Sequence, residues 1–257
     1  MVTRASVLGV GGLVVTLCLG ALPASAAVIT FGSLSLNSTG PLAATAPANL
    51  ANAPGASAFA IDSLPGFPIH VTPHLNDGSY GNSFSWIGGS GRPIDVDGDA
   101  VADVSTGFGG IDLAGSGLFQ LTQIAWGRSN LGNEFADRTQ GMYYVQVTTV
   151  SNPNEATPDS DWTTIGGVTI TTSSFGDTYR HLYDISGLPL ATGVRIVVPG
   201  VGFNNVTGTA IDEIELYGHS AAVPEPTTFA TLLGGLAVLA RRRASNRGSS
   251  RSTGSSR

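Results

Sequence analysis

The spacing of turn-forming residues constrains the fold of this chain more than any other feature. From about residue 59 to residue 218, Gly, Asn, Asp and Pro separate short stretches that are rich in Thr, Val, Ile and aromatic residues. None of these stretches sustains the 3.6-residue hydrophobic period of an amphipathic helix. Short runs of β-branched and aromatic residues between turn formers are typical of strands. The sequence therefore predicts an all-β protein, an antiparallel β-sandwich of the jelly-roll type. The expected strands cover residues 69–71, 83–87, 110–113, 119–126, 143–150, 164–171, 179–185, 194–198 and 210–217.

The stretch before this region reads differently. Residues 28–36 partly alternate as a strand would, whereas residues 37–58 are rich in Ala, Pro, Asn and Ser and bury little. We therefore expect an N-terminal strand and linker over residues 27–68, followed by the sandwich over residues 69–220.

Composition narrows the class of protein further. The 257 residues include 35 glycines, and only 12% are charged, against about 25% in an average soluble domain. This excludes a coiled coil, a charged helical bundle and an ordinary cytosolic enzyme. The chain has no lysine, and residues 27–223 hold five arginines against 17 acidic residues, a formal charge of −12. Such a surface repels nucleic acid and anionic lipid, and it favours divalent cations.

The N-terminus has the three parts of a secretory signal peptide. Arg4 is followed by an apolar stretch over residues 7–22, and Ala24-Ser25-Ala26 fits a cleavage site before Ala27. We expect signal peptidase to remove residues 1–26. The single cysteine, Cys18, lies in this segment, so the mature chain is expected to fold without disulfides.

The C-terminus also has three parts in a fixed order. Pro224, Glu225 and Pro226 precede an apolar run over residues 229–240, and three arginines follow at 241–243. The run is shorter than the roughly 20 residues that span a bilayer, and the arginines favour a cytoplasmic location for that end. Residues 221–257 resemble the PEP-CTERM sorting signal of Gram-negative bacteria. The resemblance implies recognition by an exosortase, transient membrane contact through residues 229–240, and export to the envelope, cell surface or extracellular matrix.

The predicted sandwich carries a second resemblance. Five fragments, in order, are similar to galactose-binding-like domains of the discoidin or coagulation-factor C type; they cover residues 76–87, 110–113, 121–128, 161–165 and 210–218. The resemblance implies an eight-stranded antiparallel jelly roll that binds sugars, lipids or proteins through loops at one end, usually without catalysis. It also implies a structural calcium ion between the first Asp-Gly loop and the last strand, held by Asp77, Asn82 and Glu213. The alternative is that Asp77 only forms a turn with Gly78 and that Glu213 is a surface charge.

An aspartate-rich segment predicts a calcium site of its own. Asp95, Asp97, Asp99 and Asp103 stand at relative positions 1, 3, 5 and 9, and the Val101 carbonyl stands at position 7. Oxygen ligands at this spacing can converge on one hard cation, which relieves the repulsion between the carboxylates. The segment resembles the calcium loops of dockerins and thrombospondin-type repeats, but it has an alanine at position 6 and a threonine at position 12. A solvated acidic loop without a specific ion is the alternative. Residues 92–108 look like an insertion relative to the discoidin pattern.

Polar loop residues suggest where a sugar could bind. Aromatic rings stack on sugar rings, and Arg or Asn side chains hydrogen-bond hydroxyl groups. The candidate ligand-binding residues are Arg128, Asn130, Asp137, Arg138, Asn204 and Asn205. The three tryptophans lie within strand-like runs and are expected in the core.

Enzyme motifs contribute little to the interpretation. The sequence has neither a G-x-S-x-G motif nor a phosphate-binding loop, so we expect no enzyme, although an unrecognised carboxylate site remains an alternative. We expect an exported, calcium-stabilised, non-catalytic module that binds carbohydrate, most specifically extracellular polysaccharide. The alternative function is a structural matrix or adhesion protein that binds another protein.

Overall fold

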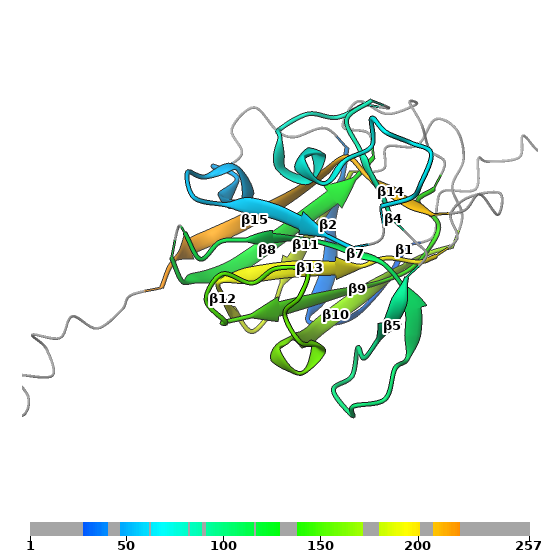
Figure 1. Cartoon of the computed structure of the whole chain (residues 1–257). Coiled ribbons are helices and arrows are strands. Elements are labelled where there is room, and N and C mark those ends of the chain that lie inside the picture. Colours follow the sequence, from blue (N-terminus) through cyan, green and yellow to red (C-terminus); the bar gives the residue numbers. More distant parts are fainter. Residues whose placement is uncertain are drawn as a thin grey trace, which may run out of the picture.

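Two antiparallel sheets dominate the computed structural model of the chain (Figure 1). The structure describes residues 28–40, 47–61, 63–81, 83–88, 91–115, 117–128, 138–171, 180–200 and 208–221. The six-stranded sheet has the order β1 (Val28–Gly32), β10 (Thr163–Ile170), β9 (Gly141–Thr148), β13 (Gly193–Val197), β7 (Phe108–Asp112), β3 (Ser57–Ala60). The five-stranded sheet has the order β12 (Leu190–Ala191), β8 (Phe119–Gly127), β11 (His181–Ile185), β2 (Leu34–Thr39), with β15 (Glu213–Ser220) also paired to β8. The predicted antiparallel β-sandwich is confirmed.

Smaller elements complete the described part of the chain. Strand β14 (Thr209–Ile211) pairs with β4 (Trp86–Gly88), and β5 (Arg92–Ile94) pairs with β6 (Val104–Thr106) to form a hairpin. Three short 3₁₀ helices are η1 (Leu50–Asn52), η2 (Thr72–Asn76) and η3 (Asp159–Asp161).

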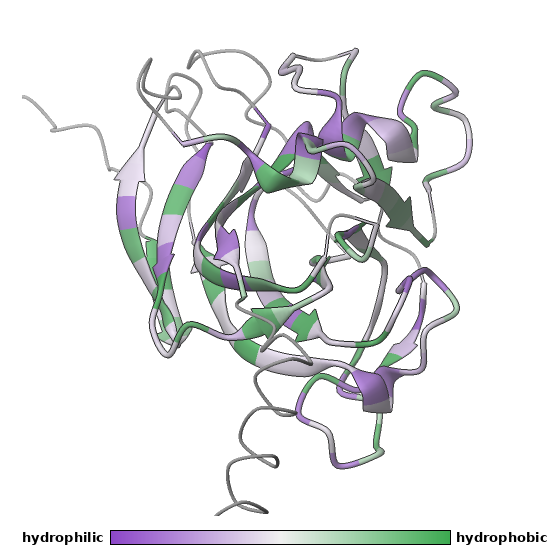
Figure 2. Cartoon of the chain, turned by 90° about the vertical axis from the view of Figure 1, so that its left-hand side faces the viewer, coloured by the Kyte–Doolittle hydropathy of each residue, from purple (hydrophilic) through white to green (hydrophobic). Residues whose placement is uncertain are grey.

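The main core lies between the two sheets. Strand β9 shows why, because alternate residues point to opposite faces of a sheet. Tyr143, Val145 and Val147 join the core between the sheets, whereas Tyr144 and Gln146 point outward. Figure 2 shows the resulting bands of hydrophobic and hydrophilic residues along the strands. Trp86 and Trp126 are buried in this core, as the sequence predicts.

The outer face of the six-stranded sheet carries a second, smaller core. The β5–β6 hairpin covers part of this face, and its Ile94 packs with residues of the sheet. The buried members of the cluster are Phe59, Ile94, Val96, Phe108, Trp162 and Val197. The guanidinium of Arg195 lies among them, 4.6 Å from the ring centroids of both Phe108 and Trp162. The predicted insertion is therefore an integral cover of the sheet.

Two expectations about the N-terminal half need correction. No strand forms over Ile69–Val71, because Pro68 and Pro73 flank the segment and proline cannot donate to a strand ladder. Part of the predicted linker is also ordered structure. Strand β3 lies within it and pairs with β7, and its small side chains Ala58 and Ala60 pack against the main core. With β1 and β2, the stretch 27–68 thus supplies three strands to the two main sheets.

The buried arginine on the outer face generates a stability prediction. Arg195 Nη2 and Arg92 Nη2 both donate to Asp159 Oδ1, at 2.9 and 2.8 Å, but the Arg195 side chain is 0% exposed and that of Arg92 is 36% exposed. Arg195 also donates from Nε to Gln146 Oε1 at 2.6 Å. Arg195→Met leaves the buried Gln146 Oε1 without this donor and takes one of two arginines from the half-buried Asp159, so we expect a loss of about 3 kcal/mol in the free energy of unfolding. The more exposed Arg92→Met is expected to cost less than about 1 kcal/mol. Denaturant unfolding of both variants checks this, and equal losses would contradict it.

Candidate functional site

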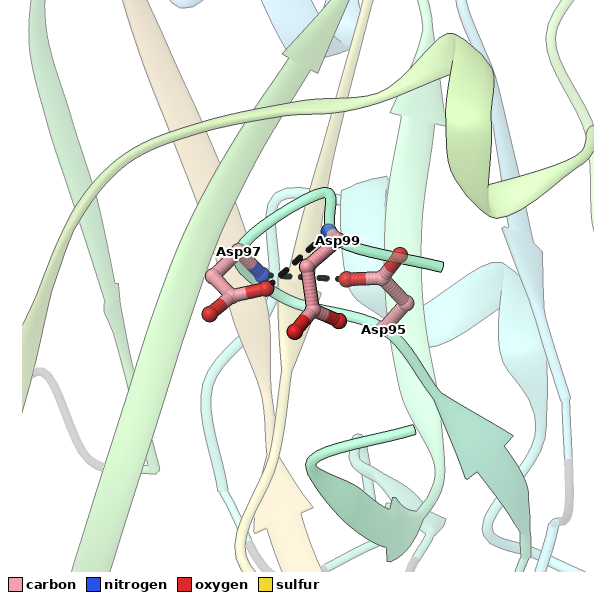
Figure 3. Close-up of side chains that lie close together, drawn as sticks. All are labelled: Asp95, Asp97 and Asp99. Carbon is pink, nitrogen blue, oxygen red and sulfur yellow. Dashed lines mark hydrogen bonds between the residues drawn. The ribbon is translucent and has the colours of Figure 1, made fainter. Parts of the chain in front are cut away.

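Three carboxylates converge on the loop that joins β5 and β6 (Figure 3). One carboxylate oxygen from each of Asp95, Asp97 and Asp99 lies within 4.8 Å of the others. Asp95 Oδ1 accepts a hydrogen bond from the Gly98 N–H at 2.7 Å, and its Oδ2 accepts one from the Ala100 N–H at 2.8 Å. These backbone donors, chiefly that of Gly98, lower the pKa of Asp95 below its ordinary value. The loop is therefore held in shape by its own first carboxylate.

The remaining predicted ligands of this loop have definite positions. Asp103 Oδ2 accepts from the Val96 N–H at 2.8 Å and so joins the two ends of the loop, outside the group of three carboxylates. The exposed Val101 donates its N–H to Asp99 Oδ1 at 2.8 Å. Ala100 has a φ of 68°, so it adopts the left-handed turn that glycine usually provides at this position. Oxygen donors gathered in this way suit a hard cation such as calcium.

The first Asp-Gly turn does lie against the last strand. Glu213, only 1% exposed, accepts from the Gly78 N–H at 2.9 Å through Oε2 and from Asn49 Nδ2 at 3.3 Å through Oε1. Asp77 accepts from the Ser79 N–H at 2.8 Å, and its other oxygen lies 2.6 Å from His74 Nδ1. The alternative in which Glu213 is a surface charge is therefore wrong. Asn82 lies outside the described residues.

Burial makes Glu213 a weak acid in this structure. Its pKa is raised to about 8, first by burial and then by the negative charges of Asp77 and Glu215, against the opposing effect of the Gly78 N–H. A divalent cation between Glu213 and Asp77 would stabilise both carboxylates in their charged forms. Among the described residues, the group of three or more acidic side chains close enough to share an ion is Asp95, Asp97 and Asp99, so a calcium ion between Asp77 and Glu213 stays a prediction.

A polar cluster forms beside the end of β8. Arg128 and Arg138, both predicted as ligand-binding residues, are buried there. Arg128 Nε lies 3.9 Å from Asp212 Oδ1. His70, also buried, has its Nδ1 2.7 Å from Ser85 Oγ. Burial lowers the pKa of His70, and the charges of Arg128 and Arg138 lower it further, although the hydrogen bond with Ser85 opposes this. The positive charges of Arg128 and Arg138 thus act on the His70 imidazole, and we call His70, Arg128 and Arg138 the polar cluster.

A hollow of about 580 Å³ adjoins this cluster. Residues 63–68 and 70–73 line it, and among them Phe67 is 39% exposed. The Arg138 guanidinium lies 5.2 Å from the Phe67 ring centroid, and the His70 ring lies 5.9 Å from it. We call this the loop hollow. It combines an exposed aromatic ring with polar donors.

The sequence analysis did not predict Phe67 or His70 as binding residues. The available signal was an aromatic residue and a histidine within a stretch punctuated by Pro65, Pro68 and Pro73, which predicts a surface loop. Nothing local shows that this loop meets the distant arginines.

Several predicted features lie outside the described residues. These are Asn130, Asp137, Asn204, Asn205, the signal peptide at 1–26, the motif Pro224, Glu225 and Pro226, and the apolar run at 229–240. In the part of the chain that is described, no helix has the length and apolar character needed to cross a membrane.

Comparison with known proteins gives structural likenesses only. No protein-family model matches the chain, and no curated protein matches its sequence. A fucolectin from striped bass (Morone saxatilis) serum has a TM-score of 0.45 at 14% identity, covering 69% of this chain and 50% of that one. Chitosan-binding module 1 of a chitosanase/glucanase from Paenibacillus sp. IK-5 has a TM-score of 0.41 at 21% identity, covering 67% and 100%. The family 32 carbohydrate-binding module of NanJ from Clostridium perfringens, in complex with galactose, has a TM-score of 0.39 at 12% identity, covering 63% and 93%. What this chain binds must therefore be inferred from its own side chains.

The pKa of Glu213 generates a pH prediction for protein kept free of divalent cations. The folded pKa of about 8 lies above the ordinary value of 4.5, so the fold favours the protonated form. The resulting stabilisation is fully present below pH 4.5 and is lost as the pH rises towards 8. We expect the Tm in a chelator to fall over this window, and Glu213→Gln to flatten the fall. Glu155→Gln, at an exposed position, is the matched control. Parallel falls of Tm in wild type and Glu213→Gln would contradict the prediction.

Proposed function

We propose that this protein is an exported, non-catalytic module that binds carbohydrate through the loop hollow. The observation that carries the proposal is the exposed Phe67 ring, which lines the hollow together with His70 and lies 5.2 Å from the Arg138 guanidinium. Guanidinium and imidazole N–H groups donate hydrogen bonds, and sugar hydroxyl oxygens accept them. The C–H face of a sugar ring packs on an aromatic face. A volume of about 580 Å³ lies within the range of small-ligand sites.

Protein binding is the second candidate function. A structural matrix or adhesion protein would use a broad surface with little concavity and an apolar centre. The loop hollow is concave, and the polar side chains of Ser63, His70 and Thr72 line it together with Phe67, which favours a small ligand with hydroxyl groups over a protein surface. Extracellular polysaccharide is the class of ligand that fits an exported module of this kind.

The proposal includes calcium as a stabilising ion. Two places support it: the three carboxylates of the loop between β5 and β6, and the pair formed by Asp77 and the buried Glu213. The second place ties the Asp-Gly turn to β15, so a cation there would stabilise the fold near the polar cluster.

Export rests on the sequence at the two ends. Signal peptidase would remove residues 1–26, and an exosortase of a Gram-negative bacterium would act at the motif of Pro224, Glu225 and Pro226. The protein would then reside at the envelope, the cell surface or in the extracellular matrix.

A glycan array followed by calorimetry tests the sugar-binding function. The array identifies the best-bound short oligosaccharide, and its dissociation constant is then measured for variants. We expect Phe67→Ala to weaken binding about tenfold, the scale of losing one aromatic anchor. Phe84→Ala is the matched control, because Phe84 is an exposed phenylalanine that does not line the loop hollow. Binding to no glycan, or equal affinity of both variants, would refute the proposal, and capture of a protein partner alone would favour the second candidate.

Thermal unfolding tests the calcium part. Calcium at about 100 times its dissociation constant should raise the free energy of unfolding by roughly 2.7 kcal/mol. Magnesium should do less, because it requires a smaller octahedral site and gives up its water reluctantly. Replacing Asp97 and Asp99 together by Asn should reduce the calcium effect without unfolding the protein. If the double variant keeps the whole effect, the site is the pair of Asp77 and Glu213; if chelation never changes the Tm, the protein is not calcium-stabilised.

A further inference from the structure

Two further hollows lie on the outer face of the six-stranded sheet, along the β5–β6 hairpin. One of about 480 Å³ is lined by Phe31, Val96, Asp97, Gly98, Tyr144 and Trp162–Thr164. The other, of about 320 Å³, is lined by residues 104–106, 142, 144 and 197–200. Tyr144 lines both, and the hairpin contributes residues to both. The two hollows are therefore neighbours, and neither contains a residue of the loop hollow.

We propose that these hollows form one groove, here called the sheet groove, which binds a stretch of a neutral polysaccharide chain. The inference rests on the proposed carbohydrate-binding function and adds a second site to it. The loop hollow would hold one or two sugar units, and the sheet groove would hold a longer run of the same kind of polymer.

Aromatic side chains are the first reason. Phe31 is 38% exposed on the outer face of β1, and its ring meets that of Tyr144 edge to face at a centroid distance of 5.8 Å. Trp162 lies against the same hollow, and its indole Nε1 has no hydrogen-bond partner among the described residues. Rings side by side along a groove are suited to successive sugar rings.

The sheet hydrogen bonding is the second reason, because it argues against an extended peptide. Tyr144 lies on an interior strand and pairs with Val197 on one side and Gly167 on the other. The backbone there has no open edge for an added strand. A ligand must therefore be recognised by side chains.

Charge is the third reason, and it selects a neutral chain. Asp97 lines the groove, and the charge of Asp103 reaches the Tyr144 hydroxyl, whose pKa is raised by burial and then by that carboxylate. The two arginines of this face, Arg92 and Arg195, both pair with Asp159. In protein free of calcium, a polymer of uronic acid or sulfated sugar would meet the negative charges of Asp97 and Asp103 here. A polysaccharide that carries only hydroxyl groups would not be repelled by these carboxylates.

Affinity gel electrophoresis and calorimetry test the inference on the purified protein. The probes are neutral glucan and galactomannan, with alginate as the anionic comparison and the array-selected short oligosaccharide as the ligand of the loop hollow. We expect Tyr144→Ala to weaken binding of a neutral polysaccharide about tenfold, and Tyr144→Phe to keep most of it. Ile29→Ala is the matched control, because Ile29 is more exposed than Phe31 on the same strand and lines neither hollow. Phe31→Ala removes the exposed ring beside Tyr144 without removing a buried residue.

The outcomes separate the two proposals. The inference stands if Tyr144→Ala and Phe31→Ala lose the polysaccharide yet keep the short oligosaccharide, whereas Phe67→Ala shows the reverse. The inference falls, while the proposed function survives, if Phe67→Ala weakens binding of both ligands and the two groove variants weaken neither. Preference for alginate, or unchanged polysaccharide binding by Tyr144→Ala, also overturns the inference. If the wild-type protein binds no glycan of any length, the proposed function falls and the groove inference falls with it.

Discussion

The buried ion pair between Arg180 and Glu215 is the contact on which much of the proposed binding end of the molecule depends. Each side chain is 3% exposed, and Arg180 Nε donates to Glu215 Oε1 at 2.8 Å. Tyr80 and Tyr217 donate their hydroxyl groups to the same carboxylate at 2.5 and 2.6 Å. Burial alone would raise the pKa of Glu215, but these donors outweigh it and lower the pKa, so the carboxylate stays charged. Because a buried charge without its partner is costly, the segment before β11, the loop at Tyr80 and strand β15 must come together.

That constraint places the neighbouring acidic residues of the chain. With Tyr80 fixed against β15, the Gly78 N–H reaches Glu213 and the Gly81 N–H reaches Asp212 Oδ2 at 2.8 Å. Asp212 in turn lies beside Arg128 of the polar cluster. Three acidic residues within four positions of the chain thus have three different roles. Glu215 forms an ion pair with Arg180, Glu213 offers a carboxylate that could bind a cation, and Asp212 lies beside Arg128. The proposed calcium ion and the proposed sugar site are therefore connected through one short stretch of β15 and the residue before it.

Sequence reasoning recovers what is local and misses what is brought together by long-range pairing. The two-residue alternation identified most strands, and the one-three-five spacing of Asp95, Asp97 and Asp99 predicted carboxylates that do converge. Sequence reasoning could not show that Glu213 is buried, since its hydrogen-bond partner Gly78 is 135 positions away in the chain. Sequence reasoning also could not place His70 near the charges of Arg128 and Arg138, because that proximity depends on the path of the loop before η2. Small side chains concealed β3, whose Ala58 and Ala60 pack closely where larger residues were expected.

The two faces of the six-stranded sheet explain how the β5–β6 hairpin can form the proposed sheet groove without disturbing the main core. On strand β9, Tyr143 and Val145 point into the main core, whereas Tyr144 and Gln146 point to the outer face. Residues of the outer face can therefore differ without altering the packing of the main core. The hairpin is fastened to that face at its base, where Asp159 pairs with Arg92 and Arg195, and by its apolar residues in the second core. Its tip, bearing the acidic loop, has little to bury and stays exposed. A cation bound at that tip would stiffen one wall of the sheet groove through Asp97, so ion and polysaccharide would favour the same hairpin conformation and each would strengthen the binding of the other.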